Sequence, residues 1–524
     1  MLNIIPYPSD CREKQGYFEL EENEVIKSDF DLSVFGLKTG ESDRFIIAKN
    51  DKLESEEYTL TVSKDCIRIE ACENAGAYYA LQTLRQLSRC ELGGKKIPCV
   101  EIKDKPRFEW RGLQLDESRH FFGKEEVKRL LDMMFMMKLN RFHWHLTDDQ
   151  GWRIEIKKYP LLTEIGSKRK YTHINGWQSI STINEEYGGF YTQDDIREIV
   201  DYAQKRNIMV IPEIDFPAHC ASAIACYPWL ACRELEREVP GYFGGSIPER
   251  VYKMWDWNRT ICVGKEKTIN FVFDIIDEVC SLFPAPYFHI GGDEAPKNEW
   301  KKCPHCQAVI KENGLKNEED LQGWFNNKIL DFIKGKGKRL IGWNEILKAG
   351  NLDKSVIGQY WTAKRDKNAE NHINSGGNLI MSNHKSFYFD IPYGKYPLKN
   401  TYCFKPEKFN VRPENIKNVL GVEGENWTEW IDGREKLDLC MYPRVQCLAE
   451  VAWSAEKDVN WDNFLKRLDS FKDYYRYLGI NYAVDKVSMP TNPFTRLHIN
   501  AKFMNGDTHL EVKLNKKYIA KGEK

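Results

Sequence analysis

The sequence predicts an α/β protein: a (β/α)8 TIM barrel, preceded by a small α/β domain and followed by a short β-rich C-terminal tail. Between residues 111 and 429, eight short apolar runs occur, and several are separated by segments with helical periodicity. Polar and aromatic side chains crowd one end of nearly every run, which is where a TIM barrel carries its active site. With 524 residues, the chain is also too long for one ordinary core, so two or three domains are expected.

The composition narrows the classes of partner. The chain has 77 basic and 78 acidic residues, a formal net charge of −1, so it has no long-range attraction to nucleic acid or to an anionic membrane. No stretch approaches the ~20 apolar residues of a membrane helix, and no signal peptide is visible. Fifteen cysteines, scattered without a spacing framework, indicate reduced thiols. We therefore expect no nucleic-acid partner, no membrane and a cytoplasmic location.

Residues 1–105 are expected to form a separate supporting domain. Apolar residues alternate over 58–62 and again over 67–69, with a polar turn between them, which predicts a β-hairpin. The segment 76–87 then carries apolar residues at helical spacing. Nothing in this region has the pattern of a catalytic site.

The catalytic barrel is expected over residues 106–480. Helices are predicted at 124–140 and 193–207, and after residue 429 at 437–453 and 462–479. The tail, 481–524, contains the alternating segments FTRLHINAKF and THLEVKLNKKYIA, which predict a β-rich appendage of unknown function. The eight barrel strands are predicted at 111–118, 141–148, 208–215, 287–294, 339–346, 355–361, 378–390 and 418–429.

The stretch HIGGDEAPKNEW (289–300) is the centre of the predicted site. Because side chains alternate along a strand, the adjacent acids Asp293 and Glu294 indicate a strand end that bends into a loop. Gly291 and Gly292 permit such a bend, or the close approach of a ligand. Two acids at the mouth of a barrel can act as a general acid and a polarising group. A helix N-terminus is the alternative, since acids are favoured there and Pro296 follows.

Polar and aromatic residues also mark the ends of the other strands. A catalytic barrel is the simplest explanation for such a concentration at one edge of the sheet. In strand order, these residues are Asp116, Arg119 and His120; His143, His145, Asp148 and Asp149; Glu213, Asp215 and His219; Trp343 and Glu345; Trp361; Tyr388 and Asp390; Trp427 and Glu429.

A metal-dependent hydrolase is one chemistry that this set allows. His143 and His145 lie two apart on a strand and hence on one face, and His219, His289 and Asp293 could complete a metal site. The neighbouring acids instead favour hydrogen-bonded histidines at a packed strand end. A Cys-Pro-His-Cys run over 303–306 also suggests zinc, but one such pair without a second is a weak signal, and it is interpreted as a feature of a loop.

A glycosidase accounts for more of the strand ends. Carboxylates supply acid catalysis, and Arg119 supplies a fixed fork of donors for hydroxyl groups. Trp343, Trp361 and Trp427 supply flat walls for a sugar ring, although tryptophans also pack barrel cores. The 15 tryptophans and 25 tyrosines of the chain fit this interpretation.

Six motifs together resemble the family 20 glycoside hydrolases, the β-N-acetylhexosaminidases. They span nearly the whole barrel in the order expected for that family, and the N-terminal segment resembles its small α/β domain. The motifs are LDESRHF, FHWHLTDDQGWR, IPEIDFPAH, HIGGDE, GWNEIL and NWTEW.

The resemblance implies a retaining mechanism without an enzyme nucleophile, an exception to the two-carboxylate rule. The substrate's 2-acetamido oxygen would attack the anomeric carbon and form an oxazolinium intermediate. Glu294 would be the general acid and then the base that activates water. Asp293 would hold the acetamido N–H. The two roles require different protonation states side by side.

The resemblance also assigns expected roles to nine further residues. Asp148 and His219 would form a hydrogen-bonded chain to Glu294, and Tyr388 would donate to the acetamido oxygen. The substrate-binding residues would be Arg119 on the O3 and O4 hydroxyls, Asp390 near the acetamido group, Trp343, Trp361 and Trp427 around the sugar, and Glu429 on O4 or O6. No cofactor and no metal are implied.

The expected activity is exo-acting release of terminal β-linked GlcNAc or GalNAc from an oligosaccharide or glycoconjugate. The same fold could instead release a disaccharide, as lacto-N-biosidases do, and a silent sugar-binding barrel is a third alternative. Three departures from the family pattern leave substrate detail open, and one of them is the unusually acidic, glycine-bearing run GVEGENWTEW near the eighth strand. Ala218 stands where glycine is common, and Glu117 either adds a charge near the sugar or points away from it.

Overall fold

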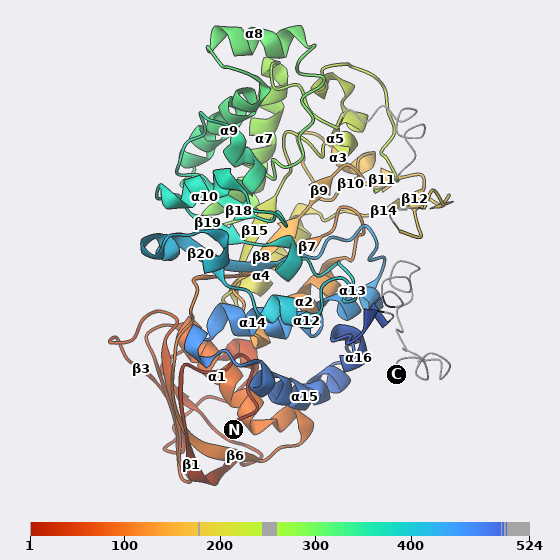
Figure 1. The fold of residues 1–524 in the computed structure, drawn as a ribbon. Coiled ribbons are helices and arrows are strands. Elements are labelled where there is room, and N and C mark those ends of the chain that lie inside the picture. Colours follow the sequence, from red (N-terminus) through yellow and green to blue (C-terminus); the bar gives the residue numbers. More distant parts are fainter. Residues whose placement is uncertain (1, 177–178, 244–258, 494, 497–498, 500–524) are drawn as a thin grey trace, which may run out of the picture.

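The computed structural model describes residues 2–176, 179–243, 259–493, 495, 496 and 499. It contains an N-terminal sheet and a closed barrel of eight strands, with helices outside the barrel (Figure 1). The N-terminal sheet lies at one end of the molecule, and the helices α7 to α9 lie at the other (Figure 1).

The N-terminal sheet has six strands in the order β1-β6-β4-β5-β3-β2. Its hairpin β4–β5 is antiparallel and pairs Leu60 with Ile69, and helix α1 (Asn74–Ser88) packs on the sheet. The predicted hairpin and helix are both confirmed. The strands are β1 (Asp10–Glu19), β2 (Lys27–Ser28), β3 (Phe45–Lys49), β4 (Tyr58–Val62), β5 (Ile67–Ala71) and β6 (Lys96–Asp104).

Buried ion pairs join this sheet to the amino-terminal end of the barrel. The guanidinium of Arg111, fully buried, donates to both carboxylate oxygens of Glu56 at 3.0 and 2.7 Å. The ammonium of Lys138 lies 3.3 Å from Asp104. Because an unpaired buried charge costs several kcal/mol, these pairs favour one relative placement of the two parts. The supporting domain thus holds the barrel from the end opposite the predicted site.

All eight predicted barrel strands are confirmed, and they close into a parallel barrel in the order β15-β16-β17-β18-β19-β20-β7-β8. Their register places Glu213 beside His145 and beside His289, so the carboxyl ends of three strands meet at one level. The strands are β7 (Trp110–Asp116), β8 (Arg141–His145), β15 (Met209–Glu213), β16 (Tyr287–His289), β17 (Arg339–Trp343), β18 (Ile357–Tyr360), β19 (Leu379–Met381) and β20 (Val419–Gly424).

Most connections between barrel strands contain a helix, as the periodicity predicts. Helix α4 begins with a capping box between Thr192 and Asp195, which satisfies amides of its first turn. The longer helices are α2 (Lys124–Met136), α4 (Gln193–Gln204), α7 (Glu266–Leu282), α8 (Pro304–Glu312), α9 (Glu318–Lys334), α10 (Lys367–Asn374), α13 (Arg434–Met441), α14 (Arg444–Trp453) and α15 (Trp461–Tyr477). The short ones are α3 (Leu161–Glu164), α5 (Ala221–Cys226), α11 (His384–Phe387), α12 (Leu398–Tyr402) and α16 (Asp485–Ser488).

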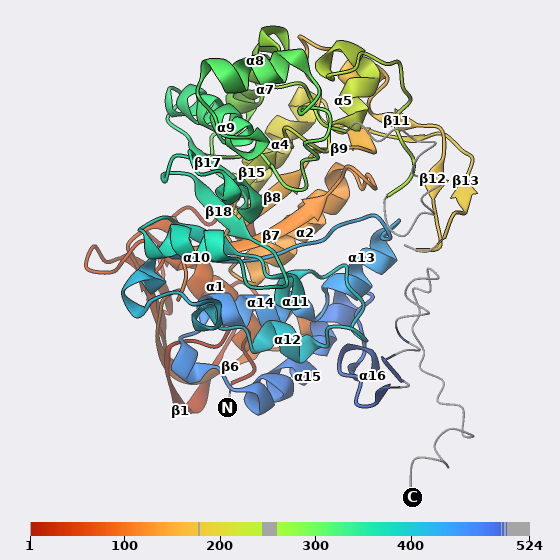
Figure 2. The ribbon, with the colours of Figure 1, turned by 45° about the horizontal axis from the view of Figure 1, so that its top comes forward.

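Short 3-10 turns and two-stranded ribbons complete the connections. The ribbons lie in the long insertion after β8, and the strands β11, β12 and β13 lie at the right of Figure 2. They are β9 (Thr147–Asp148) with β10 (Gly151–Trp152), β11 (Lys168–Arg169) with β14 (Tyr187–Gly188), and β12 (Thr172–His173) with β13 (Thr182–Ile183). The turns are η1 (Ser33–Phe35), η2 (Cys90–Leu92), η3 (Pro228–Leu230), η4 (Asn344–Lys348), η5 (Pro406–Phe409), η6 (Pro413–Asn418) and η7 (Glu456–Asp458).

Two predicted elements are interrupted in the structure. The single helix expected over 437–453 is broken into α13 and α14 at Pro443, because proline lacks the amide that a continuous helix needs. The seventh strand ends at Met381, and α11 intervenes before Tyr388, which forms a single parallel bridge with Glu425. Tyr388 therefore reaches the site from beyond a short helix.

The expected β-rich tail is not β in its described part. Residues 485–488 form α16, and residues 493, 495, 496 and 499 are helical. Of the segment FTRLHINAKF, the structure describes only residues 495, 496 and 499, and these are not extended. The second segment, THLEVKLNKKYIA, lies outside the described residues.

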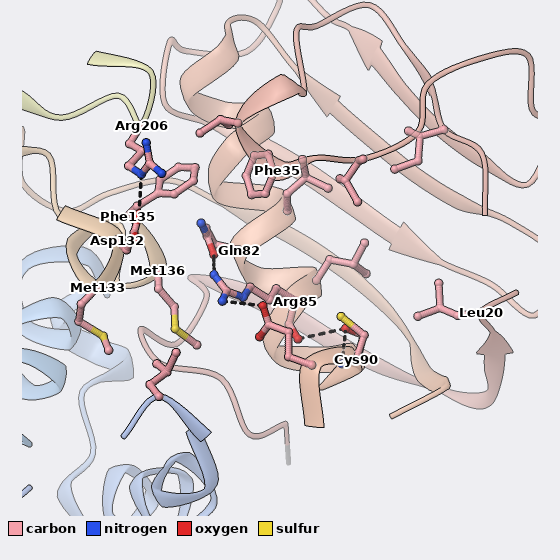
Figure 3. Close-up of a pocket in the computed structure, with 18 of the residues that line it drawn as sticks. Leu20, Phe35, Gln82, Arg85, Cys90, Asp132, Met133, Phe135, Met136 and Arg206 are labelled. Carbon is pink, nitrogen blue, oxygen red and sulfur yellow. Dashed lines mark hydrogen bonds and ion pairs between the residues drawn. The ribbon is translucent and has the colours of Figure 1, made fainter. Parts of the chain in front are cut away.

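A cavity of about 580 Å³ lies where the N-terminal sheet meets the barrel. Figure 3 shows Phe35 and Arg85 of the N-terminal part facing Met133 and Met136 of α2 across it. It is distant from the carboxyl ends of the barrel strands. None of the helices in the described residues has the length and apolar character of a membrane-spanning segment.

Candidate active site

The acid pair Asp293 and Glu294 lies in the loop that leaves strand β16 at the carboxyl end of the barrel. Gly291 has a φ of 67° and Gly292 a φ of 90°, a backbone that favours glycine. A Cβ on Gly291 would lie 2.1 Å from a carboxylate oxygen of Asp215. The glycine pair therefore serves both purposes that the sequence suggested, a bend and a close approach. The next helix, α8, starts only at residue 304, so the alternative of a helix N-terminus at the acid pair is wrong.

Two predicted site residues have a backbone that side chains rarely adopt. The φ of His219 is 51° and that of Glu294 is 45°. Each such residue costs of order 1 kcal/mol and persists only where surrounding contacts enforce it. Such outliers concentrate at functional sites, and here the two side chains face each other.

His219 lies between Asp148 and the acid pair. Its Nδ1 lies 3.1 Å from Asp148 Oδ1, and its Nε2 lies 3.6 Å from Asp293 Oδ2 and 3.8 Å from Glu294 Oε2. Asp148 and His219 thus form the chain toward Glu294 that the resemblance implies, with Asp293 at nearly the same distance. The imidazole can pass charge or a proton between a buried carboxylate and the acid pair.

The three buried groups of this chain have shifted proton affinities. Burial would raise the pKa of Asp148, but Arg119 and His219 outweigh it and hold that pKa well below its ordinary value. Burial would likewise lower the pKa of His219, but chiefly Asp148 holds it well above. Burial raises the pKa of Asp293 to about 7, with repulsion from Glu345 added and attraction to His219 opposing it. These shifts favour the protonated, positively charged form of His219 and bring the pKa of Asp293 close to neutral pH.

Arg259 is a site residue that sequence reasoning missed. Its guanidinium lies 3.2 Å from Glu294 Oε2 and 3.4 Å from Asp149 Oδ2. It comes from a loop without hydrophobic periodicity, far along the chain from either partner, so nothing in the sequence pointed to it. Its charge lies beside Glu294, whose side chain is 49% exposed.

Glu345 also borders the acid pair. It accepts a hydrogen bond from the Trp361 indole at 3.2 Å and one from the backbone of Glu294. Burial raises its pKa. The sequence marked Glu345 as a strand-end residue but assigned it no role. Here it holds the acid-bearing loop against a predicted wall of the sugar pocket.

Beneath the acid pair, Glu213 connects four side chains in the barrel interior. It accepts from the Trp343 indole at 2.9 Å, and it contacts His145, His143 at 3.1 Å and His289 at 3.1 Å. These charge-assisted contacts orient Trp343 and the histidines. They also make the floor of the site rigid.

The histidines that suggested a metal-dependent hydrolase face carboxylates. His145 contacts Glu213 through Nδ1 and Asp148 through Nε2, and His143 Nδ1 lies 2.7 Å from Glu423. Three barrel groups do bring ligand atoms close enough for an ion: His143 with Glu213 and His289, His143 with Glu423 and Glu425, and Asp148 with Asp215 and His219. Their mutual pairing nevertheless fits a hydrogen-bonded network that orients the site.

Four aromatic residues line one side of the acid pair. Trp361 stacks on Tyr388 at 6.0 Å with an interplanar angle of 24°. Trp427 lies 6.3 Å from Tyr388 and 5.7 Å from Trp343. Trp343 is only 1% exposed, whereas Trp361, Tyr388 and Trp427 are half-buried. The arrangement is a set of flat apolar walls of the kind that sugar rings pack against.

Arg119, Glu429 and Asp390 form a polar group that borders the aromatic wall at Trp427. The Arg119 guanidinium lies 2.7 Å from Asp148 and 3.9 Å from Glu429, and it stands over the Trp427 ring at 5.3 Å. Burial raises the pKa of Glu429 to about 7 and that of Asp390 well above its usual range. Asp390 Oδ1 is buried without a hydrogen-bond partner. These groups are positioned to accept hydroxyl donors from a bound polyol.

Glu117 points away from this site. Its carboxylate accepts from the Tyr191 hydroxyl and the Phe122 amide, both at 2.7 Å. Burial raises its pKa to about 8. Of the two placements that the sequence left open, the one near the sugar is therefore wrong.

The structure gathers all the predicted site residues at one mouth of the barrel, although their roles remain predictions. They are Asp148, His219, Asp293, Glu294 and Tyr388 as catalytic residues, and Arg119, Trp343, Trp361, Asp390, Trp427 and Glu429 as substrate-binding residues. A TIM barrel with paired acids, an aromatic wall and hydroxyl-binding groups at its carboxyl end has the features of a glycoside hydrolase.

Comparisons with known proteins identify the family. Residues 108–456 match the model of the glycosyl hydrolase family 20 catalytic domain, and residues 31–105 match that of the family's domain 2. The chain belongs to glycosyl hydrolase family 20. This membership favours the glycosidase over the metal-dependent hydrolase.

Individual relatives agree with the family models. A beta-hexosaminidase of Porphyromonas gingivalis is 36% identical over 93% of this chain, which spans 65% of that relative's length. An exo beta-N-acetylglucosaminidase of Vibrio harveyi, solved with N-acetylglucosamine, superposes with a TM-score of 0.81 at 31% identity, covering 92% of this chain and 78% of that one. A beta-N-acetylhexosaminidase of Bacteroides fragilis gives 0.79 at 30% identity, covering 93% and 99%.

Proposed function

We propose that this protein is an exo-acting retaining β-N-acetylhexosaminidase that releases terminal β-linked GlcNAc or GalNAc from oligosaccharides or glycoconjugates. The observation that carries the proposal is the pair Asp293 and Glu294, joined through His219 to Asp148 in a family 20 barrel. The names of the relatives support the same substrate class.

The reaction proceeds in two steps that need no enzyme nucleophile. In the first, Glu294 gives its proton to the glycosidic oxygen while the substrate's acetamido oxygen bonds to the anomeric carbon and the aglycone leaves. In the second, the Glu294 carboxylate takes a proton from water, whose oxygen opens the oxazolinium ring. Glu294 suits both steps because its side chain reaches the open mouth of the site, 49% exposed.

Asp293 stabilises the charge that develops on the acetamido nitrogen. Its Oδ1 is buried and has no hydrogen-bond partner, so it is free to accept the acetamido N–H. Its pKa is raised to about 7, first by burial. A cationic oxazolinium beside it favours the carboxylate form, so the ion pair is strongest in the intermediate and not in the ground state.

His219 connects Asp148 electrostatically to the acid pair. As a cation it lies between Asp148, which stays ionised, and the acid pair. Arg259 adds a second positive charge on the outer side of Glu294. These groups hold the base form of Glu294 in place after it has given up its proton.

The pocket walls favour a sugar with an N-acetyl group at the end of a chain. Trp361, Tyr388 and Trp427 present flat faces, and Arg119 and Glu429 offer a hydrogen-bonding fork and an acceptor for hydroxyls. We assign hydroxyl binding to Arg119 and Glu429, and contact with the acetamido methyl group to the aromatic wall.

The decisive experiment measures hydrolysis of p-nitrophenyl β-GlcNAc and β-GalNAc by wild type, Glu294→Gln and Asp293→Asn. Each substitution should lower kcat by about 100-fold or more, because general acid catalysis and charge stabilisation each contribute on that order. Glu299→Gln, on the same loop but paired with Arg233 on the outside, is the matched control and should leave kcat unchanged.

An inhibitor separates substrate assistance from other mechanisms. A thiazoline that mimics the oxazolinium ion should inhibit the wild type tightly and the Asp293→Asn variant weakly. Hydrolysis that survives both active-site substitutions would overturn the assignment. Activity on a disaccharide glycoside alone would identify the lacto-N-biosidase alternative.

A cytoplasmic location remains part of the proposal. Its support is the set of fifteen free cysteines, which suits a reducing compartment. The enzyme would then act on imported or recycled oligosaccharides. Finding the protein in the secreted fraction of its cells would contradict this.

A further inference from the structure

Four cysteines from distant parts of the chain bring their sulfur atoms together outside the active site. They are Cys232, Cys262, Cys303 and Cys306, and all four sulfurs lie within 4.8 Å of one another. We infer that they bind one zinc ion, which fastens the loop after β15 to the loop that carries the acid pair. The site is separate from the proposed catalytic chemistry and does not depend on it.

The spacing of the sulfurs fits a single tetrahedral ion. A Zn–S bond of about 2.3 Å places the sulfurs of a four-thiolate site about 3.8 Å apart. Here Cys262 lies 3.5 Å from Cys303 and 3.6 Å from Cys306, and Cys232 lies 3.9 Å from Cys306. A disulfide would instead need about 2.05 Å between one pair and would leave the other pair unrelated. Tetrahedral four-sulfur sets favour zinc or iron among the biological metals.

The surroundings are those of a closed structural site. Cys262 and Cys306 are fully buried, Cys303 is 4% exposed, and Cys232 closes the outer side half-buried. All four positions are filled by protein ligands, with none left for water or substrate, as in structural zinc sites. The ammonium of Lys265 donates to the carbonyl next to Cys232 at 2.7 Å and to the Glu234 carboxylate at 2.9 Å, so it orders the chain beside Cys232.

The backbone around the cluster is built for close approach. The Cys262 amide donates to Leu230 at 2.7 Å, and Ala231 pairs with Ile261 in an antiparallel bridge, so Cys232 and Cys262 are held side by side. A Cβ on Gly264 would lie 2.4 Å from the Cys306 amide nitrogen. Glycine at that position lets the Cys262 segment meet the start of helix α8, where Cys303 and Cys306 lie.

The same segment positions the active-site arginine. Three residues before Cys262, the Arg259 carbonyl accepts from the Cys220 amide at 3.0 Å, and the Ile261 amide donates to Pro217 at 2.9 Å. The Trp300 indole, from the loop of the acid pair, donates to the Ile261 carbonyl at 2.9 Å. A metal at the cluster therefore fixes Arg259 relative to the loop that ends in Cys303.

The sequence showed only half of this site. Cys303 and Cys306 form a recognisable pair, and their interpretation as a feature of a loop, without a role, is replaced by the zinc site. Cys232 and Cys262 come singly, from separate points of one long connection, so no second pair was visible in the sequence.

The first test is the metal content of the wild type. The full chain, free of affinity tags and purified under reduction without chelators, is measured by inductively coupled plasma mass spectrometry. About one zinc ion per chain is expected. Iron in place of zinc, two disulfides by non-reducing mass spectrometry, or no metal from zinc-supplemented cells would each overturn the inference. Replacement by Co²⁺ should give the sulfur-to-metal charge-transfer and visible bands of a tetrahedral thiolate site.

The second test removes a ligand. Cys232→Ser takes away the half-buried ligand, and Cys280→Ser, also half-buried but in helix α7, is the matched control. Zinc should pass from Cys232→Ser to a chromogenic chelator at least about tenfold faster than from wild type or control. Equal release rates would contradict the site. If Cys232→Ser does not fold, the metal content and cobalt spectrum of the wild type still decide.

A positional readout tests the proposed role of the ion. On zinc removal, amide hydrogen exchange should accelerate in residues 259–264 and 300–306, and strand β15 should keep its protection. Unchanged exchange in both loops would show that the ion does not fasten them.

Discussion

Replacing Asp293 with asparagine should stabilise the folded protein above neutral pH, although it lowers kcat by about 100-fold or more. The carboxyl of Asp293 is 16% exposed and its pKa is raised from 3.8 to about 7, first by burial and with like charges adding. Asparagine has nearly the same shape but does not ionise. Ionisation of Asp293 therefore lowers the stability of the folded wild type, and the variant lacks this effect.

The sign and size of the effect follow from proton linkage. Below pH 3.8 both folded and unfolded wild type hold the proton, so Asp293 contributes no difference. Between there and about pH 7 the unfolded chain ionises first, and stability falls by about 1.4 kcal/mol per pH unit. Above about pH 7 Asp293 is ionised in both the folded and the unfolded state, so the loss of stability levels off. It reaches about 4 kcal/mol at most, because neighbouring groups readjust.

Urea denaturation followed by tryptophan fluorescence measures this difference. The advantage of Asp293→Asn over wild type should grow by about 2 to 3 kcal/mol between about pH 5 and about pH 8. Glu41→Gln, whose side chain is 89% exposed, controls for the loss of one negative charge. A difference between Asp293→Asn and wild type that does not change with pH, or that shrinks as pH rises, would refute the reasoning.

Three further substitutions test other parts of the structure. Arg259→Ala removes the charge beside Glu294 and should lower kcat by about 10- to 100-fold on p-nitrophenyl β-GlcNAc, and Arg259→Lys should be partly active. If Arg259→Ala has the kcat of the wild type, the contact with Glu294 does not contribute to catalysis. Arg119→Lys loses the planar fork and should raise KM by about tenfold, and an unchanged KM would remove Arg119 from substrate binding. Gly421→Ala places a Cβ 1.8 Å from the Trp110 carbonyl and should lower stability by more than about 3 kcal/mol in thermal unfolding, whereas Gly433→Ala meets nothing within 4 Å and should be neutral.

Much of the fold could be predicted because its signals are local. Eight apolar runs with intervening helical periodicity were enough for the barrel, and alternation over 58–62 was enough for the hairpin. Errors occurred where local signals were ambiguous. The short segment from residue 494 alternates but is helical in its described part, and the helix over 437–453 contains a proline whose effect a periodicity count ignores.

The site was predictable only in so far as its residues stand at strand ends. Asp293 and Glu294 follow a strand directly, so their place at the barrel mouth followed from the fold. Tyr388 lies beyond a helix that the sequence did not indicate. Arg259 and the role of Glu345 were missed because their contacts with Glu294 depend on how two loops fold back over the barrel.

By itself, the sequence determined the barrel, the acid pair at its mouth and the family, because each is written in neighbouring residues or in motifs at a defined order along the chain. The tertiary structure alone decided that Arg259 lies beside Glu294, that Glu117 turns away from the sugar, and that Cys232 and Cys262 meet Cys303 and Cys306. The physical reason is that burial, charge and ligand geometry depend on distances in space. Residues far apart in the chain come within a few ångströms only when the strands close into a barrel and the loops pack over its carboxyl end.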